Sequence, residues 1–463
     1  MIQQIATIVT IAGIVWLFVM DRDAQARTSK ALWIPVIWLL IVGSRPTSLW
    51  FNLNTSMSMA EQYSEGSPFD ATVYGTLIAA GLLTLNHRSS QVRRFIQGNF
   101  PILLFFAYCA LSILWSDYPF ISLKHWIKAV GDVVMVLIVL TDPYPLAAIR
   151  RFFSWTAFLL VPLSVLFIMY YPSLGRYYDS GDKITYYTGV TTNKNSLGVI
   201  CLVCGLGMLW SFIGAYEERK LPHRSRHLIA RGIILATATG LIVKADSMTS
   251  LSCFVMGGSV MVMATQKWVA ERTSYMHVLV GSAVALPLFA IFLDTAGSLV
   301  HALGRNTTLT GRLSIWTAVL SVQTNPLLGT GYESFWLGSR LQRVWDMTST
   351  GIQEAHNGYI EVYLNLGWIG LILLCGLIVT GYRHAYALYC RDPHVGRLRL
   401  ALLTAGVIYG LTEASFRMMS PIWIAFLLVI PYVPQYLPKV KRQRTLQFPL
   451  TQIVSPRRVR ILQ

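Results

Sequence analysis

Long apolar runs recur along the whole chain and constrain its fold more than any other feature. Each run has about 17 to 20 residues, which at about 1.5 Å of rise per helical residue crosses a hydrocarbon core of roughly 30 Å. A helix also satisfies its own backbone polar groups inside a bilayer. We therefore expect an all-α, polytopic integral membrane protein with about 12 or 13 transmembrane helices. The runs are residues 5–20, 31–50, 69–85, 99–116, 124–141, 152–171, 195–214, 228–244, 250–265, 275–293, 358–381, 400–417 and 419–437.

Composition supports this class and disfavours a set of soluble domains. Apolar residues make up 54% of the 463 residues and charged residues 13%, and the mean hydropathy is +0.51. The one long polar interruption is residues 294–357. We divide the chain into a membrane domain at residues 1–437, which includes this loop, and a basic tail at residues 438–463.

Lys and Arg residues fall mainly in alternate loops and in the tail. These segments hold 26 of the 38 basic residues, and the positive-inside rule predicts that they are cytoplasmic. The net charge of +17 then reflects membrane topology, with membrane lipids as the anionic partner. No nucleic-acid partner is expected, because no recognition fold accompanies the basic tail. The loop at residues 294–357 is predicted to face outward.

The first apolar run has two interpretations. Ala24-Gln25-Ala26 resembles a signal-peptide cleavage site, but no Lys or Arg precedes the run. We interpret the run as a span with its N-terminus outside. If it is removed or lies on the membrane surface, 12 spans remain with both ends inside. Residues 294–357 face outward in either case.

The remaining 12 basic residues lie on the outward side, against the usual bias. An anionic substrate such as a diphosphate would explain them, because guanidinium groups bind phosphate with two parallel hydrogen bonds. They are Arg45, Lys124, Lys128, Arg176, Lys183, Lys194, Lys244, Arg305, Arg312, Arg340, Arg343 and Arg417. The alternative is that they pair with nearby acids, namely Asp179, Asp182, Asp246, Glu333, Asp346 and Glu354. Within one span, Lys128 and Asp132 are four residues apart; we expect them to form a pair, the alternative being that they line a water-filled cavity.

His356 is the candidate general base. It stands at the water boundary, just before a predicted helix, and Asn357 and Glu361 give it polar neighbours at helical spacing. A histidine titrates near neutrality and can accept a proton from a sugar hydroxyl. A purely structural histidine is the alternative, but the loop that ends here is rich in arginine and aromatic residues, which favours catalysis.

Arg312 opens a run, residues 313–323, that predicts an interfacial helix ending before Asn325-Pro326. The N–H groups at the start of that helix and the Arg312 guanidinium could together hold a phosphate. The alternative is an arginine that reaches lipid headgroups.

Lys194 lies at another predicted helix start, with Asn193 or Asn195 as the N-cap. A cation is unfavourable near a helix N-terminus unless an anion is shared there, which favours a substrate role for Lys194. Tyr332 and Trp336 offer flat faces on which sugars could stack, although packing within the loop would use the same rings.

A set of short motifs occurs in a fixed order. The motifs are Thr188-Gly189-Val190, Asn193-Lys194-Asn195-Ser196-Leu197-Gly198, Gly311-Arg312 with Trp316, Asn325-Pro326-Leu327-Leu328-Gly329-Thr330-Gly331-Tyr332, and Ala355-His356-Asn357-Gly358-Tyr359. In this combination the chain resembles the O-antigen ligase/polymerase (Wzy-like) family, particularly its exopolysaccharide-polymerisation branch. Trp115-Ser116-Asp117-Tyr118-Pro119 also resembles the outward turn that follows an early span in that family.

The resemblance implies a GT-C-like glycosyltransferase of the bacterial inner membrane that acts on the periplasmic face. Its donor would be an undecaprenyl-diphosphate-linked oligosaccharide, used without a nucleotide sugar or another cofactor. The further partners would be a sugar acceptor and a chain-length regulator protein. Transfer would be inverting and metal-independent, with His356 activating the acceptor hydroxyl and Arg312 holding the diphosphate.

The candidate substrate-binding residues are Lys194, Arg176, Asn195, Asn357, Tyr332, Trp336 and Arg417. Family members often carry arginine near the position of Lys194. No close acidic pair for a metal is expected in the outward loops, where Asp179 and Asp182 come nearest to one.

Three kinds of function remain open at this point: glycan transfer, transport and a non-catalytic role. A polymerase and an O-antigen ligase, which transfers the glycan to a lipid A core, would bind the same donor and differ in the acceptor. A flippase or transporter of the lipid-linked glycan is disfavoured, because the chain shows no internal repeat and no inverted pair of broken spans. A non-catalytic protein that organises other membrane components is the third hypothesis.

Overall fold

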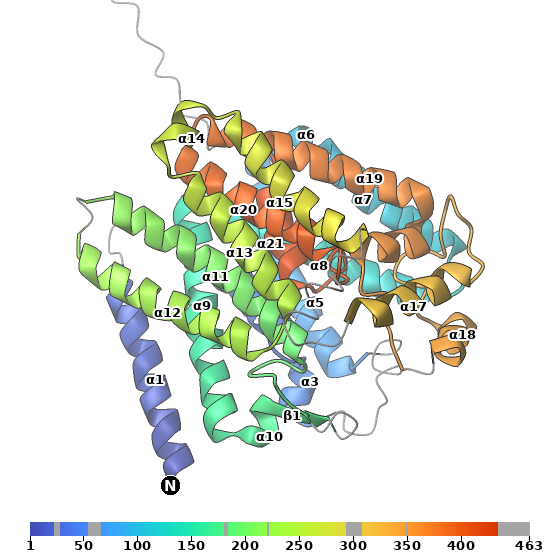
Figure 1. Ribbon diagram of the computed structural model, residues 1–463, viewed down its shortest axis with the longest axis horizontal. Helices are drawn as coiled ribbons and strands as arrows, with labels where there is room; N and C mark the ends of the chain where they lie inside the picture. Colours follow the sequence, from blue (N-terminus) through green and yellow to red (C-terminus); the bar gives the residue numbers. More distant parts are fainter. Residues whose placement is uncertain are drawn as a thin grey trace, which may run out of the picture.

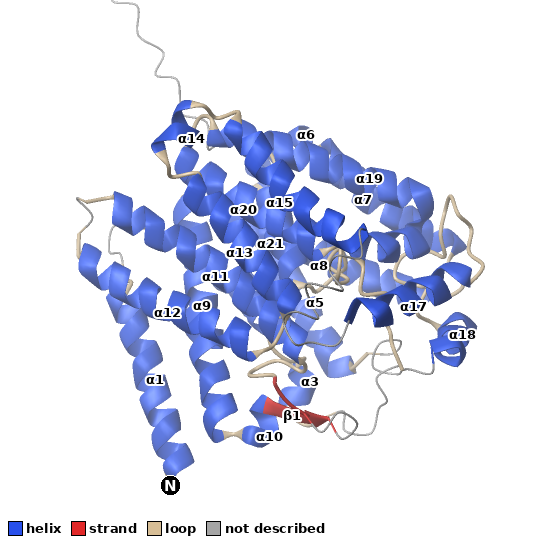
Figure 2. Ribbon diagram, viewed as in Figure 1, coloured by secondary structure: helices blue, strands red, loops and turns tan. Residues whose placement is uncertain are grey.

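The protein is a bundle of helices with one short strand pair at its edge (Figures 1 and 2). The computed structural model describes residues 1–22, 28–53, 66–179, 184–219, 222–292, 308–348 and 351–433. The all-α class is confirmed for this part of the chain. The predicted basic tail at residues 438–463, together with Asp182, Lys183 and Arg305, lies outside the described residues.

Each predicted apolar run contains a helix, although several helices are shorter than the run. The helices are α1 (Ile2–Met20), η1 (Lys30–Leu32), α2 (Trp33–Val42), α3 (Thr47–Trp50), α5 (Pro68–Asn86), α6 (Ser89–Gly98), α7 (Phe100–Leu111), η2 (Ser112–Trp115), α8 (Pro119–Leu140), α9 (Pro145–Tyr170), α10 (Pro172–Gly175), α11 (Lys194–Glu217), α12 (Arg224–Lys244), α13 (Met248–Met263), α14 (Lys267–Glu271), α15 (Tyr275–Phe292), α17 (Thr308–Ser321), α18 (Gly338–Thr348), α19 (Gly358–Tyr389), α20 (Pro393–Tyr409) and α21 (Pro421–Val429). The antiparallel strands are β1 (Arg176–Asp179) and β2 (Ile184–Tyr187).

Six described helices are long and apolar enough to cross a membrane: α1, α5, α9, α11, α12 and α19. A seventh span results if α6 and the run α7–η2, which meet at 90°, are counted together. The segment η1–α2, α13 and α15 are shorter apolar helices, whereas α8 is interrupted by three charged residues. The polytopic membrane class is thus confirmed, and the count of 12 or 13 spans stays a prediction.

The centre of the bundle is formed by α11, α20 and α21, with α9, α12, α13 and α19 packed around them (Figure 1). Every residue of α20 from Val395 to Tyr409 is buried, as is every residue of α21. Helices that are apolar on all sides require such a covered position. The turn between these two helices, residues 410–420, is therefore anchored at both ends in the rigid core.

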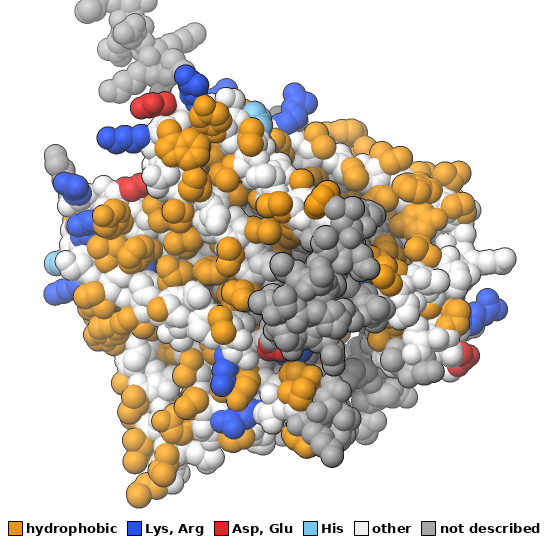
Figure 3. Space-filling view, viewed as in Figure 1, with side chains coloured by type: hydrophobic (Ala, Val, Ile, Leu, Met, Phe, Trp, Pro, Cys, Tyr) orange, Lys and Arg blue, Asp and Glu red, His pale blue; other side chains and the backbone are white. Residues whose placement is uncertain are grey.

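The outer face of the bundle carries many hydrophobic side chains (Figure 3). On α1 they include Ile8, Val15 and Val19, each more than half exposed. In the view of Figure 3, Lys and Arg side chains gather along the upper left edge, near α14 in Figure 1. An apolar flank with charged ends is the surface that a lipid bilayer requires.

The glycine turn at residues 329–331 docks on α19 where that helix is broken. Gly367 lies inside α19 with a φ of 64°, and Thr330 N and Gly331 N donate to the carbonyls of Leu364 and Asn365. A Cβ on Gly329 would lie 2.4 Å from the Asn365 backbone, so a side chain there would block the contact. This turn fixes the outward loop on the bundle, and α18, which the sequence did not predict, follows it.

Candidate active site

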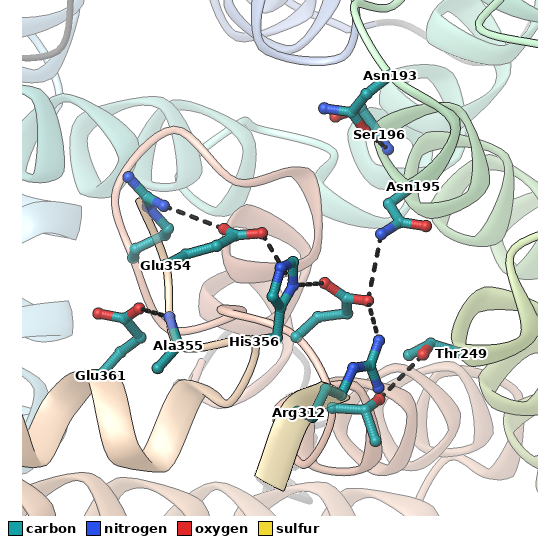
Figure 4. A network of polar contacts seen from close by, with 12 residues as sticks. Asn193, Asn195, Ser196, Thr249, Arg312, Glu354, Ala355, His356 and Glu361 are labelled. Atoms are coloured by element: carbon teal, nitrogen blue, oxygen red, sulfur yellow. Dashed lines mark hydrogen bonds and ion pairs between the residues drawn. The ribbon is translucent and has the colours of Figure 1, made fainter. Parts of the chain in front are cut away.

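Glu413 is the centre of a polar cluster, and Figure 4 labels its partners Asn195, Arg312 and His356. It lies in the turn between α20 and α21, and its side chain is 6% exposed. Its Oε1 accepts hydrogen bonds from Arg312 Nη2 at 2.8 Å and Asn195 Nδ2 at 3.3 Å, and its Oε2 lies 3.1 Å from His356 Nδ1. One carboxylate therefore joins α11, α17 and the segment before α19.

The two loops that meet here are held together by their backbones. Asn357 is the N-cap of α19, where its Oδ1 accepts from Tyr359 N, while its Nδ2 donates to Leu411 O at 3.0 Å. The next residue continues the contact, because Gly358 N donates to Gly410 O at 2.8 Å. These bonds clamp the segment around His356 onto the turn that carries Glu413, and they give Asn357 a structural role.

His356 is presented by an unusual backbone conformation. Its φ of 49° lies in the left-handed region, which histidine adopts more often than most residues but which still costs free energy. Its Nδ1 lies 3.1 Å from Glu413 Oε2 and 3.2 Å from Glu354 Oε1. Facing two carboxylates, Nδ1 carries the proton, and Nε2 of the neutral ring is left as the acceptor.

Opposing effects act on the pKa of His356. Burial lowers it, because the charged imidazolium loses hydration. The hydrogen bond to Glu413 and the negative charges of Glu354 and Glu413 raise it, and Arg312 lowers it. The net result is a pKa above the ordinary value of histidine.

Glu354 extends the cluster on the other side of His356. Its Oε2 accepts from Arg417 Nη1 at 3.3 Å, and Arg417 Nη2 lies 4.0 Å from Glu333. The prediction that the outward loops hold no close acidic pair is therefore wrong. Glu354 and Glu413 approach each other through His356, and the ligand atoms of the three residues lie within 4.8 Å of one another.

Such a spacing also suits a divalent cation, because carboxylate oxygens and imidazole nitrogen are common metal ligands. Here, however, each carboxylate already forms an ion pair with a guanidinium: Glu413 pairs with Arg312, and Glu354 pairs with Arg417. Two arginines beside the position oppose a further positive charge. The cluster as folded is better suited to proton transfer next to an anion.

Trp316 sets the position of Arg312. Its indole N–H donates to Ala355 O at 2.8 Å, and Arg312 lies one turn earlier on the same helix. That helix, α17, ends at Ser321, before Asn325-Pro326 as predicted, but it begins at Thr308. Arg312 therefore lies one turn inside the helix and not at its first residue.

A cavity of about 640 Å³ opens beside the cluster. Its volume is typical of a small-molecule site. Among the described residues, Arg312 is not part of the lining, and it reaches the cluster through Glu413. The charged or titratable lining residues other than tyrosine are His125, Lys128, Lys194, Glu354, His356, Glu413 and Arg417.

The start of α11 forms one side of this cavity. Asn193 is its N-cap, since its side chain accepts from Ser196 N at 2.8 Å, which confirms one of the two predicted caps. Lys194 Nζ lies 4.0 Å from Asp246 and 4.1 Å from the centroid of the Tyr186 ring. Lys194 and Asn195 are thus both placed at the cavity, as a substrate role requires.

Four predicted substrate-binding residues are not in the cavity lining: Asn357, which caps α19, and Arg176, Trp336 and Tyr332. Arg176, in β1, donates from Nε to Ile168 O at 2.8 Å. Trp336 is 2% exposed and donates to the Glu361 carboxylate, and Tyr332 is 7% exposed. These contacts supply structural roles, and sugar stacking on the two rings stays a prediction without an open ring face to support it.

The predicted pair between Lys128 and Asp132 is wrong. The fully buried Asp132 carboxylate accepts instead from Trp38 Nε1 at 2.8 Å and from Met419 N at 2.9 Å. Helical spacing permits the pair, but two neighbouring elements supply better-placed donors. Glu413 is the candidate site residue that sequence reasoning missed, although an acid between two strongly apolar runs was a usable signal.

The fold and this cluster define a class: an all-α polytopic membrane protein in which turns between helices gather a histidine, arginines and carboxylates beside a polar cavity. Residues 232–375 match the family model described as O-antigen ligase, a segment that contains Arg312 and His356 but ends before Glu413. The chain is also 27% identical over 305 residues to the exopolysaccharide production protein ExoQ of Rhizobium meliloti (strain 1021). That match covers 62% of this chain and 66% of the relative. These findings confirm the resemblance to the Wzy-like O-antigen ligase/polymerase family.

Proposed function

We propose that this protein is a membrane glycosyltransferase that transfers or polymerises undecaprenyl-diphosphate-linked oligosaccharide units, as an exopolysaccharide or O-antigen polymerase does. The observation that carries the proposal is the shared carboxylate of Glu413. It holds a candidate base, His356, and a candidate anion-binding residue, Arg312, in one cluster beside the cavity. The cavity opens this cluster to a substrate, which neither a structural histidine nor a lipid-facing arginine requires.

In the proposed reaction an acceptor sugar hydroxyl attacks the anomeric carbon of the donor sugar. A new C–O bond forms there, and the bond to the diphosphate oxygen breaks, so that the polyprenyl diphosphate leaves with the electron pair. His356 Nε2 takes the hydroxyl proton. Glu413, bonded to Nδ1, orients the ring and stabilises the imidazolium that forms. Attack opposite the leaving group inverts the anomeric centre.

The leaving diphosphate carries negative charge that the site must stabilise. Lys194 and Arg417 line the cavity and supply positive charge, and Arg312 adds to it through the cluster. Preorganised cations are effective here because they need little rearrangement during the reaction. The chemistry requires no metal, so metal independence is part of the proposal.

The active face is proposed to be periplasmic and the location the bacterial inner membrane. Support comes from the distribution of Lys and Arg residues, since the loops that carry the site alternate with the most basic loops. A sugar acceptor and a chain-length regulator protein are the proposed partners.

Mass analysis of lipid-linked glycans in a deletion strain tests the proposal. A polymerase predicts that single repeat units accumulate on the outer leaflet while long polymer disappears. His356→Ala or Arg312→Ala should reproduce this accumulation while the protein still inserts in the membrane. Normal polymer from both variants would contradict the proposal.

A ligase is the second candidate, favoured by the description of the matching family model. It predicts that polymer on the lipid carrier persists in the deletion strain and that only transfer to the lipid A core is lost. A flippase predicts that repeat units stay on the cytoplasmic leaflet. Leaflet-specific labelling of the accumulated glycan therefore separates the three functions.

A further inference from the structure

Lys128 is an ionisable residue in an unusual place. It is the tenth of the 22 residues of α8, about halfway along a mainly apolar helix, and it is only partly exposed. Its side chain lines the same cavity as His356. An ammonium group at such a position is costly unless a counter-ion or a polar cavity compensates it.

The neighbouring carboxylates are bonded elsewhere. Asp132, one turn further along α8, is held by Trp38 and Met419. Asp70, in α5, accepts from Ser48 N at 2.8 Å and from the Ser48 hydroxyl. Neither carboxylate forms an ion pair with Lys128 in the described part of the chain.

Besides Asp70, the charge of Glu333 reaches Lys128, and Glu333 faces Arg417 at 4.0 Å. The one aromatic contact of Lys128 is with Tyr74, whose ring centroid is 6.0 Å from Nζ. That distance is at the limit of a cation–π interaction. Asp70 and Glu333 thus act on the ammonium from a distance, and within the described residues no carboxylate lies at ion-pair distance from it.

The other cations of the lining differ in this respect. Lys194 is 4.0 Å from Asp246, and Arg417 is 3.3 Å from Glu354. Within the described lining, Lys128 is the cation whose charge no carboxylate neutralises at ion-pair distance. Its positive charge is thus left for a ligand that enters the cavity.

We propose that Lys128 forms an anion-binding subsite on the α8 wall of the cavity and binds a phosphate oxygen of the donor diphosphate. The proposal rests on the proposed function for the identity of the donor. The cavity volume of about 640 Å³ accommodates a diphosphate together with sugar. Lys128 is then a positioning residue, which holds the leaving group while His356 acts on the acceptor.

Binding of undecaprenyl diphosphate to the purified full-length protein in nanodiscs tests the subsite. Lys128→Gln should weaken binding about tenfold, because a charge-assisted hydrogen bond is lost. Lys128→Arg should restore most of the affinity. Lys124→Gln is the matched control, since Lys124 lies one turn earlier on α8, 4.7 Å from the Phe120 ring centroid, and outside the described lining. The control should change binding less than about twofold.

A second variant guards against misfolding. Lys128→Met keeps the length of the side chain but removes the charge, so the thermal unfolding midpoint should stay equal to or above that of the wild type. A marked fall in the midpoint would show that Lys128 has a structural partner and would overturn the proposal. Unchanged diphosphate binding in Lys128→Gln, or an equal loss for uncharged undecaprenol, would also overturn it.

The result is separable from that of the proposed function. If Lys128→Gln loses diphosphate binding while His356→Ala still makes normal polymer, the subsite stands and the catalytic proposal fails. If polymer synthesis depends on His356 while Lys128→Gln binds undecaprenyl diphosphate normally, the catalytic proposal stands and the subsite fails.

Discussion

Two clusters in the described part of the chain place a carboxylate between a histidine and an arginine. In the first, Asp21 Oδ1 lies 2.9 Å from His227 Nδ1 and 2.8 Å from Arg231 Nε. It joins the end of α1 to α12, and Arg231 also donates to Ser211 O. The side chains of His227 and Arg231 are 4% and 3% exposed and that of Asp21 is 11% exposed, so the histidine and the arginine are sealed within the protein.

The second cluster has the same kinds of partner but a different setting. Arg312 and His356, on Glu413, are 19% and 26% exposed, and His356 lines a cavity. The comparison shows that chemical composition does not make a site here. What distinguishes the second cluster is access from the cavity, together with a histidine ring nitrogen that can contact a ligand. The first cluster should therefore matter for stability and the second for activity.

The largest expected effect is on transfer activity. His356→Ala should lower the rate of glycan transfer at least about 100-fold, the usual contribution of a general base. His227→Ala, the matched change in the sealed cluster, should leave the rate of the folded protein within about twofold. In vitro transfer per milligram of folded protein measures both, and equal losses would remove the distinction between the clusters.

Stability should show the opposite order. Asp21→Ala leaves the buried Arg231 cation without its carboxylate and should cost about 3 kcal/mol in free energy of unfolding. Glu413→Ala should cost less, because Arg312 retains access to water. Thermal unfolding in detergent compares the two variants. A lower midpoint for Glu413→Ala than for Asp21→Ala would contradict this ranking.

A smaller effect is expected when the Glu413 charge is removed but its shape is kept. Glu413→Gln should reduce transfer about tenfold, since the imidazolium loses its stabilising carboxylate while His356 is retained. Kinetics should show the loss mainly in kcat. A loss confined to KM would instead indicate that Glu413 serves donor binding through Arg312.

The pH dependence sharpens the comparison further. A general base must be neutral, so activity should rise with pH through the pKa of His356. This rising part of the profile, the acid limb, should lie above the ordinary pKa of histidine, because the pKa of His356 is raised. Glu354→Gln removes one of the charges that raise it, and the limb should move to lower pH. A pH–rate profile of kcat/KM gives the answer, and a limb that moves to higher pH would exclude this assignment.

The smallest effect is expected outside the cavity. Arg176→Gln should change transfer by less than about twofold, because Arg176 lies in β1 and bonds to the Ile168 carbonyl. A large loss of transfer with normal folding would restore Arg176 as a substrate-binding residue.

Several features of the site were predictable from local sequence. His356 directly precedes a helix, Asn193 is a helix N-cap, and α17 ends before Asn325-Pro326, and each follows from a spacing of a few residues. The partners of these residues were not predictable. Glu413 meets His356 across 57 positions in the chain, and nothing in the local pattern of either segment specifies the other.

The amino-acid sequence by itself determined that the chain is a helical membrane protein and which of its loops concentrate positive charge. Both follow from local features, namely the length of each apolar run and the number of Lys and Arg residues in each loop. Only the tertiary structure decided which ionisable groups meet. Lys128 and Asp132 had the spacing for a pair, yet Asp132 accepts from Met419 N, 287 positions away, because packing of α8 against the turn before α21 brings that N–H to hydrogen-bond distance. Contacts of this kind depend on the final arrangement of the helices. The same arrangement places one cluster of a carboxylate, a histidine and an arginine inside the protein and a similar one beside a cavity.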